Sequence, residues 1–134
     1  MTTKEFLQQY RVAEDSIRAK LDQIHTLREL TTKTTRELSG ERVQTSRGHD
    51  TVAEIISKIV DMEHEVDHEI DRLEEIKRQV EDCIEKVPHA KQRTVLTLRY
   101  INGLTWERIA SDMDISYQWV CELHKRAIQK ISES

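Results

Sequence analysis

The stretch LTLRYINGLTWERIASDMDISYQWVCELHKRAIQKI (residues 96–131) has the residue types required by two short helices that cross closely after a tight turn. A small residue must stand where the second helix crosses the first, and Ala110 meets this need. Asp114, four residues later, is of a type that tolerates the positive φ of such a turn. Val120 supplies a β-branched side chain at the crossing. The stretch therefore predicts a helix-turn-helix, the motif whose second helix enters the DNA major groove.

Start and stop signals divide this C-terminal part into three expected helices. Pro88 suits the first turn of one helix, and Gly103 is suited to end it. Thr105 and Ser116 are natural N-caps for the two helices that follow. The expected helices cover about residues 88–101, 105–113 and 116–132.

Two longer segments precede this part and carry apolar residues at the heptad spacing of helices that pack side by side. In the second, about 51–87, apolar residues recur every seven positions, and a line offset by three is interrupted only at Glu69. The first, about 3–38, has the same pattern with breaks at Lys20 and two threonines. Residues 39–50, with two glycines and no periodicity, predict a loop. We therefore expect an all-α protein, in which a long antiparallel helical hairpin (a coiled coil) precedes a small helix-turn-helix domain.

Further apolar residues lie beside the heptad lines, which makes the apolar stripe wider than one partner helix can cover. They are Leu7, Leu21, Ile56, Ile70 and Ile84. We therefore expect two hairpins to pair into a homodimer. Residues 1–87 would be the oligomerisation region and residues 88–134 the DNA-binding domain.

Charge is distributed unevenly between these two parts. Residues 1–87 hold 14 Lys/Arg and 20 Asp/Glu, a balance of −6, whereas residues 88–134 hold 7 and 5, a balance of +2. The C-terminal part is therefore the end suited to bind a polyanion. No apolar run approaches membrane-spanning length, the N-terminus lacks a signal-peptide core, and Cys83 and Cys121 are isolated. These features favour a cytoplasmic protein that has no contact with a membrane.

Residues 64–68 read HEVDH, which matches the zinc-protease pattern H-E-x-x-H. The heptad register places His64 and His68 on the outer, solvent-facing side of their helix and Val66 on the inner side. No third ligand follows at a recognised spacing, and no Gly-rich phosphate loop or Ser/His/Asp set offers another chemistry. We therefore expect no enzymatic activity, no metal site and no cofactor.

The run L-R-Y-x-x-G-L-T-x-x-x-I-A-x-x-x-x-I-S-x-x-x-V, followed by R-A-I-x-K-I, resembles region four of bacterial sigma factors, which reads the −35 promoter element. The start T-K-E-F-L-x-x-Y and the V-P-x-x-K-Q-R before the motif extend the resemblance to small phage regulators. These are the sigma-region-four-like late-transcription activators of Gram-positive phages and prophages, of the RinA/ArpU type. The resemblance implies a transcriptional regulator that binds promoter DNA and contacts the host RNA polymerase.

The chain also departs from sigma factors. Asp114 stands where they often have glycine, and the start of the second motif helix lacks their strong hydrogen-bond donors. The −35 specificity of a sigma factor is therefore not transferred to this chain. Nothing in residues 1–87 resembles the region that melts the −10 element, so a complete sigma factor is not expected.

The start of the second motif helix is expected to present the base-facing surface. Gln118 can pair with adenine, and Glu122 can accept from the N4 amino group of cytosine. Trp119 either reads DNA or packs against Leu123, and the sequence leaves both open. The base-facing candidates are Ser116, Tyr117, Gln118, Trp119, Cys121 and Glu122.

Polar and basic residues near helix ends are candidates for contacts with DNA phosphates. Lys125 and Arg126 lie one turn beyond the base-facing residues, although an ordinary solvated face is the alternative for both. The phosphate candidates are Lys91, Arg93, Thr105, Arg108, Lys125 and Arg126.

Two other functions remain open on the sequence. A coiled coil joined to a small helical domain also suits an adaptor that binds RNA polymerase without touching DNA. A phage DNA-packaging subunit of the small-terminase kind likewise joins a helix-turn-helix to an oligomerising part, but it usually carries the DNA-binding helices first. A dimer would favour the regulator, and a ring of eight or more the packaging subunit.

Overall fold

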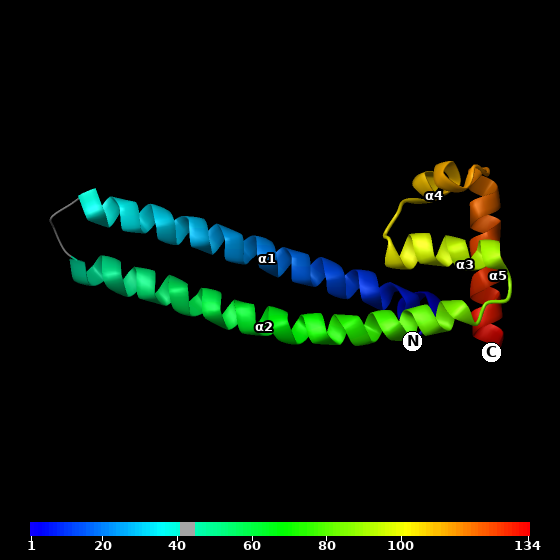
Figure 1. Cartoon of the computed structure of the whole chain (residues 1–134), viewed down its shortest axis with the longest axis horizontal. Helices are drawn as coiled ribbons and strands as arrows, with labels where there is room; N and C mark the ends of the chain where they lie inside the picture. Colours follow the sequence, from blue (N-terminus) through cyan, green and yellow to red (C-terminus); the bar gives the residue numbers. More distant parts are fainter. Residues whose placement is uncertain (41–44) are drawn as a thin grey trace. The chain divides into compact units, whose positions relative to one another are not determined.

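The computed structural model describes residues 1–40 and 45–134, with side chains described for residues 1–36 and 51–134. Every element in this part is helical (Figure 1), so the predicted all-α fold is confirmed. Two long helices come first, α1 (Thr3–Gly40) and α2 (Thr45–Glu85). They are followed by α3 (Ala90–Leu96), the π-helical turn η1 (Thr97–Ile101), α4 (Trp106–Met113) and α5 (Tyr117–Glu133).

The connection between the long helices is shorter than the predicted loop at residues 39–50. Helix α1 continues to Gly40 and α2 begins at Thr45, so helix occupies both ends of that range; residues 41–44 lie outside the described residues. The absence of apolar periodicity did not mean the absence of helix. A helix that has already nucleated gains one hydrogen bond for each added residue, with or without an apolar face. One glycine inside such a helix, Gly48, costs only about 1 kcal/mol.

The chain forms two compact units. The first holds Met1–Glu14 and Arg72–Ser134, and the second holds Asp15–Asp71. The boundary predicted after residue 87 therefore falls inside the first unit. That residues 88–134 fold as a separate domain stays a prediction.

In the second unit, α1 and α2 run antiparallel and bury the predicted heptad lines between them. Lys20 pairs with Glu69 and Arg28 with Glu63, so rising residue numbers on α1 meet falling numbers on α2. The buried residues of the lines are Ile17, Ile24, Ile55, Ile59 and Val66. His64 and His68 are exposed on either side of Val66, as the heptad register predicted.

The two charged interruptions of the heptad lines pair with each other. The ammonium group of Lys20 donates to Glu69, and it lies 3.6 Å from a carboxylate oxygen of Glu65. The hydrogen bond to Glu69 is the largest cause of the raised pKa of Lys20. The other oxygen of Glu69 is buried and has no hydrogen-bond partner within the described residues. A lysine and a glutamate that each interrupt an apolar line thus compensate each other across the helix pair.

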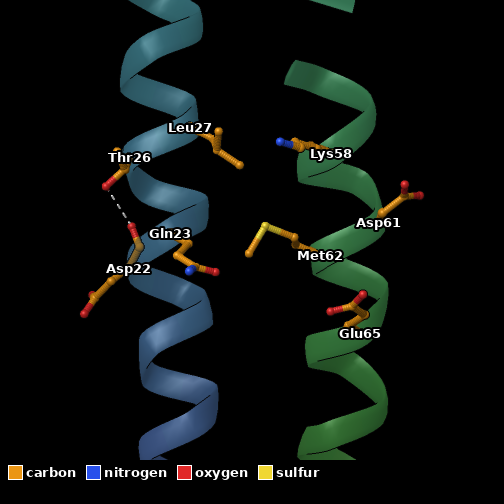
Figure 2. A pocket seen from close by; sticks show the side chains of 8 residues that line it. All are labelled: Asp22, Gln23, Thr26, Leu27, Lys58, Asp61, Met62 and Glu65. Atoms are coloured by element: carbon orange, nitrogen blue, oxygen red, sulfur yellow. Dashed lines mark hydrogen bonds between the residues drawn. The ribbon is translucent and has the colours of Figure 1, made fainter. Parts of the chain in front are cut away.

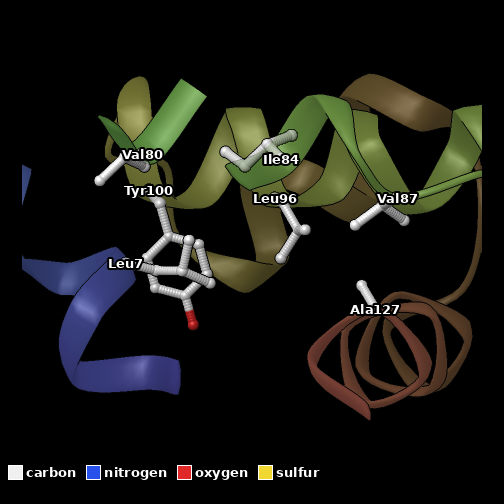
Figure 3. Close-up of a cluster of buried hydrophobic side chains, with 7 residues drawn as sticks. All are labelled: Leu7, Val80, Ile84, Val87, Leu96, Tyr100 and Ala127. Atoms are coloured by element: carbon white, nitrogen blue, oxygen red, sulfur yellow. The ribbon is translucent and has the colours of Figure 1, made fainter. Parts of the chain in front are cut away.

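The first unit buries a core to which α1, α2, α3, η1 and α5 all contribute (Figure 3). Its members are Leu7, Val80, Ile84, Val87, Leu96, Tyr100 and Ala127. Leu7 and Ile84 were expected to need a second chain to cover them, and this expectation was wrong. Helices from the C-terminal part of the same chain cover both residues, a long-range contact that heptad spacing does not encode.

Other residues beside the heptad lines remain exposed in the second unit. The exposed fractions are 48% for Leu21, 47% for Ile56 and 37% for Ile70. All three hold the same heptad position, directly after the second apolar line of their helix, and we call the side of the helix pair that carries them the lateral face. Large apolar side chains grouped on a surface are typical of protein interfaces.

The short helices follow the predicted order with two differences. Helix α3 begins at Ala90 with His89 in the capping position, so Pro88 precedes the helix rather than entering its first turn. The end of the same segment is π-helical from Thr97 to Ile101, which no sequence pattern indicated. Gly103 follows with φ 71°, a conformation that favours glycine, and a Cβ atom there would collide with the Arg11 side chain. None of the described helices is long and apolar enough to cross a membrane.

Candidate nucleic-acid interface

The turn between α4 and α5 has the geometry that the sequence predicted. Thr105 caps α4, because its side-chain oxygen accepts a hydrogen bond from the backbone N–H of Arg108 at 3.2 Å. Asp114 ends the helix in the left-handed conformation, with φ 55° and ψ 47°. The N–H of Ile115 then donates to the carbonyl of Ala110 at 3.1 Å, which closes the turn. The left-handed conformation costs about 1–2 kcal/mol for a residue other than glycine, although aspartate tolerates it better than most.

Helix α5, the second helix of the motif, is held by its cap and by a small core. Ser116 accepts a hydrogen bond from the N–H of Trp119 at 3.1 Å and is the N-cap. Val120 is completely buried at the crossing, as predicted, and packs in a cluster with partly buried Ala110 beside it. The buried members of the cluster are Val95, Ile109, Val120 and Leu123.

A buried histidine on α5 also anchors the helix, and the sequence reasoning missed it. A ring nitrogen of His124 lies 2.7 Å from the Tyr100 hydroxyl, and the Trp106 ring meets the imidazole edge-on at a centroid distance of 4.7 Å. Burial, with smaller contributions from Lys4 and Arg99, lowers the pKa of His124 to about 4. Its spacing of four from Val120 and three from Ala127 places it on the buried side of the helix, and this was the signal that could have identified it.

The predicted base-facing residues lie together on the open side of α5. Ser116, Tyr117, Gln118, Trp119 and Cys121 are exposed, and Glu122 is half-buried. Trp119 keeps 38% of its surface exposed, so it is not packed into the core. A surface with two exposed aromatic rings on a capped helix can contact bases and the thymine methyl group.

Two of these side chains, Glu122 and Trp119, contact one predicted phosphate contact, Arg126, on α5. The guanidinium of Arg126 donates from Nε to a carboxylate oxygen of Glu122 at 3.1 Å, and its central carbon lies 5.2 Å from the centre of the Trp119 ring. Glu122 and Arg126 were predicted as separate contacts, with cytosine and with phosphate. In the structure they form one ion pair, so Glu122 orients the arginine.

The remaining phosphate candidates differ in their surroundings. Lys91 and Lys125 are exposed. Arg108 is paired with Asp112 at 3.0 Å, and Thr105 is occupied as the cap of α4. Arg93 is half-buried and donates from Nη1 to the backbone carbonyl of Val87 at 2.7 Å. Among these candidates, the structure brings only Lys91 and Arg126 to the same hollow, which also includes Gln92.

A larger hollow of about 610 Å³ lies in the second unit, between α1 and α2 (Figure 2). Gln23, Leu27 and Met62 point into the space between the helices, whereas the carboxylates of Asp22 and Asp61 point away from it. No group of three or more potential metal ligands occurs among the described residues. The arrangement offers a shallow apolar strip rather than a set of converging polar groups.

Comparison with known proteins identifies the C-terminal segment. Residues 89–133 match the family model described as sigma-70, region 4. The comparisons with curated proteins and with solved structures found no match. The matched range begins within one residue of the predicted start of the C-terminal part, and it contains α3, η1, α4 and α5. This segment is therefore a helix-turn-helix of the sigma-70 region 4 type.

Proposed function

We propose that this protein is a sequence-specific transcriptional regulator that reads promoter DNA with α5, binds as a homodimer and contacts the host RNA polymerase. The observation that carries the proposal is the match of residues 89–133 to sigma-70 region 4. Within this range, α5 begins with a capped turn and presents an open polar face. The narrower assignment, a late-gene activator of phage or prophage, rests on the sequence resemblance. A regulator of this kind works on the genome, so we place it in the cytoplasm with the nucleoid.

The proposed dimer would suit this function, because a single domain with a small net positive charge is expected to make few phosphate contacts. A net charge of +2 over residues 88–134 gives modest attraction to DNA at physiological salt. Two linked domains turn the second binding event into an intramolecular one and suit a site with two-fold symmetry. The lateral face of Leu21, Ile56 and Ile70 is the surface we assign to the dimer contact.

We expect the purified protein to have twice the chain mass of 15.8 kDa at micromolar concentration, measured by light scattering. Changing both Leu21 and Ile70 to glutamate should give a monomer, because two buried charges without partners oppose association. Val12→Glu is the matched control, since Val12 is 66% exposed and lies outside the lateral face. A monomeric wild-type protein would refute the dimer, and a ring of eight or more chains would favour the packaging subunit.

The DNA-reading role predicts different effects for two residues of α5 that are seven positions apart, Gln118 and Lys125. Gln118→Ala should relax the preference for a selected duplex over a scrambled one by about 1–3 kcal/mol, because a base-edge contact is lost. Lys125→Ala should weaken binding to both duplexes alike and reduce the salt dependence by about one counterion. Selection of sites from random duplexes, followed by gel shifts, measures both effects.

Matched controls come from the same protein. Gln129→Ala changes an exposed glutamine farther along α5, and Lys86→Ala changes an exposed lysine outside the motif; both should bind as the wild type does. Unchanged binding by both Gln118→Ala and Lys125→Ala would reject the assignment of these contacts. If the wild-type protein selects no duplex and still binds RNA polymerase, the adaptor function replaces the regulator.

A further inference from the structure

The lateral face carries an ion pair between its apolar residues. Arg28 and Glu63 hold the same heptad position as Leu21, Ile56 and Ile70, directly after the second apolar line of their helices. The guanidinium of Arg28 donates to the carboxylate of Glu63 across the helix pair, and the two side chains are 61% and 44% exposed. An ion pair this exposed contributes little to the stability of one chain. Both charged groups are also open to a second chain.

Charge on the lateral face is divided between the two helices. The face includes the position of Arg28 and Glu63 and the position three residues before it, which lies beside it on a helix surface. In the second unit, over residues 15–36 and 53–71, the charged or titratable residues at these two positions are Arg18, His25 and Arg28 on α1, and Glu63 and Asp67 on α2. The other residues at these positions are apolar or threonine. The α1 half of the face is therefore positive, and the α2 half is negative.

The symmetry of a dimer leaves two ways to pair such a face with its own copy. Two copies that use the same face are related by a two-fold axis that lies in the plane of contact. An axis along the helices sets α1 of each copy against α2 of the other, so the positive half meets the negative half. An axis across the helices sets α1 against α1 and α2 against α2, and like charges then oppose association.

An axis along the helices also aligns the central ion pairs. Arg28 and Glu63 lie at the same level of the helix pair, since their side chains are in contact. A rotation about this axis keeps the level, so Arg28 of each copy comes opposite Glu63 of the other. Two arginines and two glutamates then alternate in one network. Charges in a network contribute more than an isolated exposed pair, and charged pairs beside an apolar seam set the partner and its orientation.

We propose that the dimer has its two-fold axis along the helices of the second unit, with α1 of each copy against α2 of the other and with Arg28 and Glu63 selecting this pairing. The inference rests on the proposed function, which assigns the dimer contact to the lateral face, and it adds the orientation of the copies. Asp15 and Asp71 lie at the same end of the second unit, because α1 and α2 are antiparallel. Both chains therefore leave the paired second units at one end, which suits two half-sites on one duplex.

Exchanging the charges of the central pair tests the orientation. A chain with Arg28→Glu and Glu63→Arg keeps an ion pair within each copy, with its sign reversed, and should form homodimers as the wild type does. In a mixed dimer of wild-type and exchanged chains, two arginines face each other and two glutamates face each other. The wild-type chain is labelled with ¹⁵N, and an equimolar mixture is allowed to exchange subunits. Native mass spectrometry should then find heterodimers several-fold below the level of random mixing.

The matched control exchanges an ion pair outside the lateral face. Arg78 and Glu75 of α2 form an exposed pair at 2.8 Å, and a chain with Arg78→Glu and Glu75→Arg should mix with the wild type at random. If the chain with exchanged Arg28 and Glu63 instead forms an excess of heterodimers with the wild type, like helices face each other and the proposal is overturned. Random mixing of that chain would exclude the central pair from the contact and overturn the proposal as well.

Neutral variants test the same contact without introducing a new charge. Arg28→Gln with Glu63→Gln should raise the Kd of the dimer several-fold, measured by analytical ultracentrifugation, because the network of four charges is lost. If like helices faced each other, the same changes would remove repulsion and lower the Kd, contrary to the proposal. Arg78→Gln with Glu75→Gln should leave the Kd unchanged. A monomeric wild-type protein would refute the dimer of the proposed function, whereas a dimer that mixes at random refutes only its orientation.

Discussion

Replacing Ile109 with alanine is expected to lower the free energy of unfolding by about 2–5 kcal/mol and to abolish DNA binding well below the wild-type melting temperature. Ile109 is completely buried among Val95, Val120 and Leu123, where α4 crosses α5. Truncating it removes apolar contacts and leaves a cavity that the surrounding side chains fill only in part. Urea unfolding followed by circular dichroism measures the loss.

The size of this effect depends on burial, which the control tests directly. Val12→Ala also shortens an aliphatic side chain, but Val12 is largely exposed, and the change should alter stability by less than about 0.5 kcal/mol. If Ile109→Ala is as stable as the wild type, then α4 and α5 do not pack as described. The position of the predicted base-facing residues at the start of α5 would then need another explanation.

Acidification is expected to destabilise the protein through His124. Burial lowers the pKa of this histidine to about 4 in the folded protein, against about 6.5 in an unfolded chain. Between these values the unfolded state binds the proton more readily, so the stability contributed by neutral His124 is complete above pH 6.5. It is lost progressively as pH falls toward 4, by up to about 3 kcal/mol.

His124→Gln isolates this contribution because glutamine can still hydrogen-bond Tyr100 and does not titrate. The difference in unfolding free energy between wild type and His124→Gln should narrow as pH falls from 7 to 4. His64→Gln, a change at an exposed histidine, should leave the pH profile of the wild type unaltered. Parallel pH profiles for the wild type and His124→Gln would contradict the prediction, as would an NMR titration that places the His124 pKa near 6.5.

The sequence indicated the burial of these two residues, Ile109 and His124, with different clarity. Ile109 is an apolar residue beside Ala110, at the predicted crossing of the two motif helices, so the sequence alone indicates that it is buried. The helical spacing of His124 places it on the buried side of α5, but its hydrogen-bond partner Tyr100 lies 24 residues earlier, and the sequence did not indicate that contact. The role of Trp119 was likewise open until the structure placed it on the exposed face, beside Arg126.

The sequence by itself determined the features that depend on near neighbours along the chain. Helix caps at Thr105 and Ser116, the left-handed Asp114 and the outward position of His64 all follow from local backbone geometry and helical spacing. Such features repeat over a few residues, so a pattern of letters is enough to reveal them.

Only the tertiary structure decided which distant residues meet. It paired Lys20 with Glu69, covered Leu7 and Ile84 with the C-terminal helices, and brought Lys91 and Arg126 to the same hollow. Each of these contacts depends on how whole helices pack, because packing is set by the combined burial of many side chains rather than by the spacing of a few. The helix that carries the candidate recognition residues was therefore predictable from the sequence, whereas the distant residues that pack around it were not.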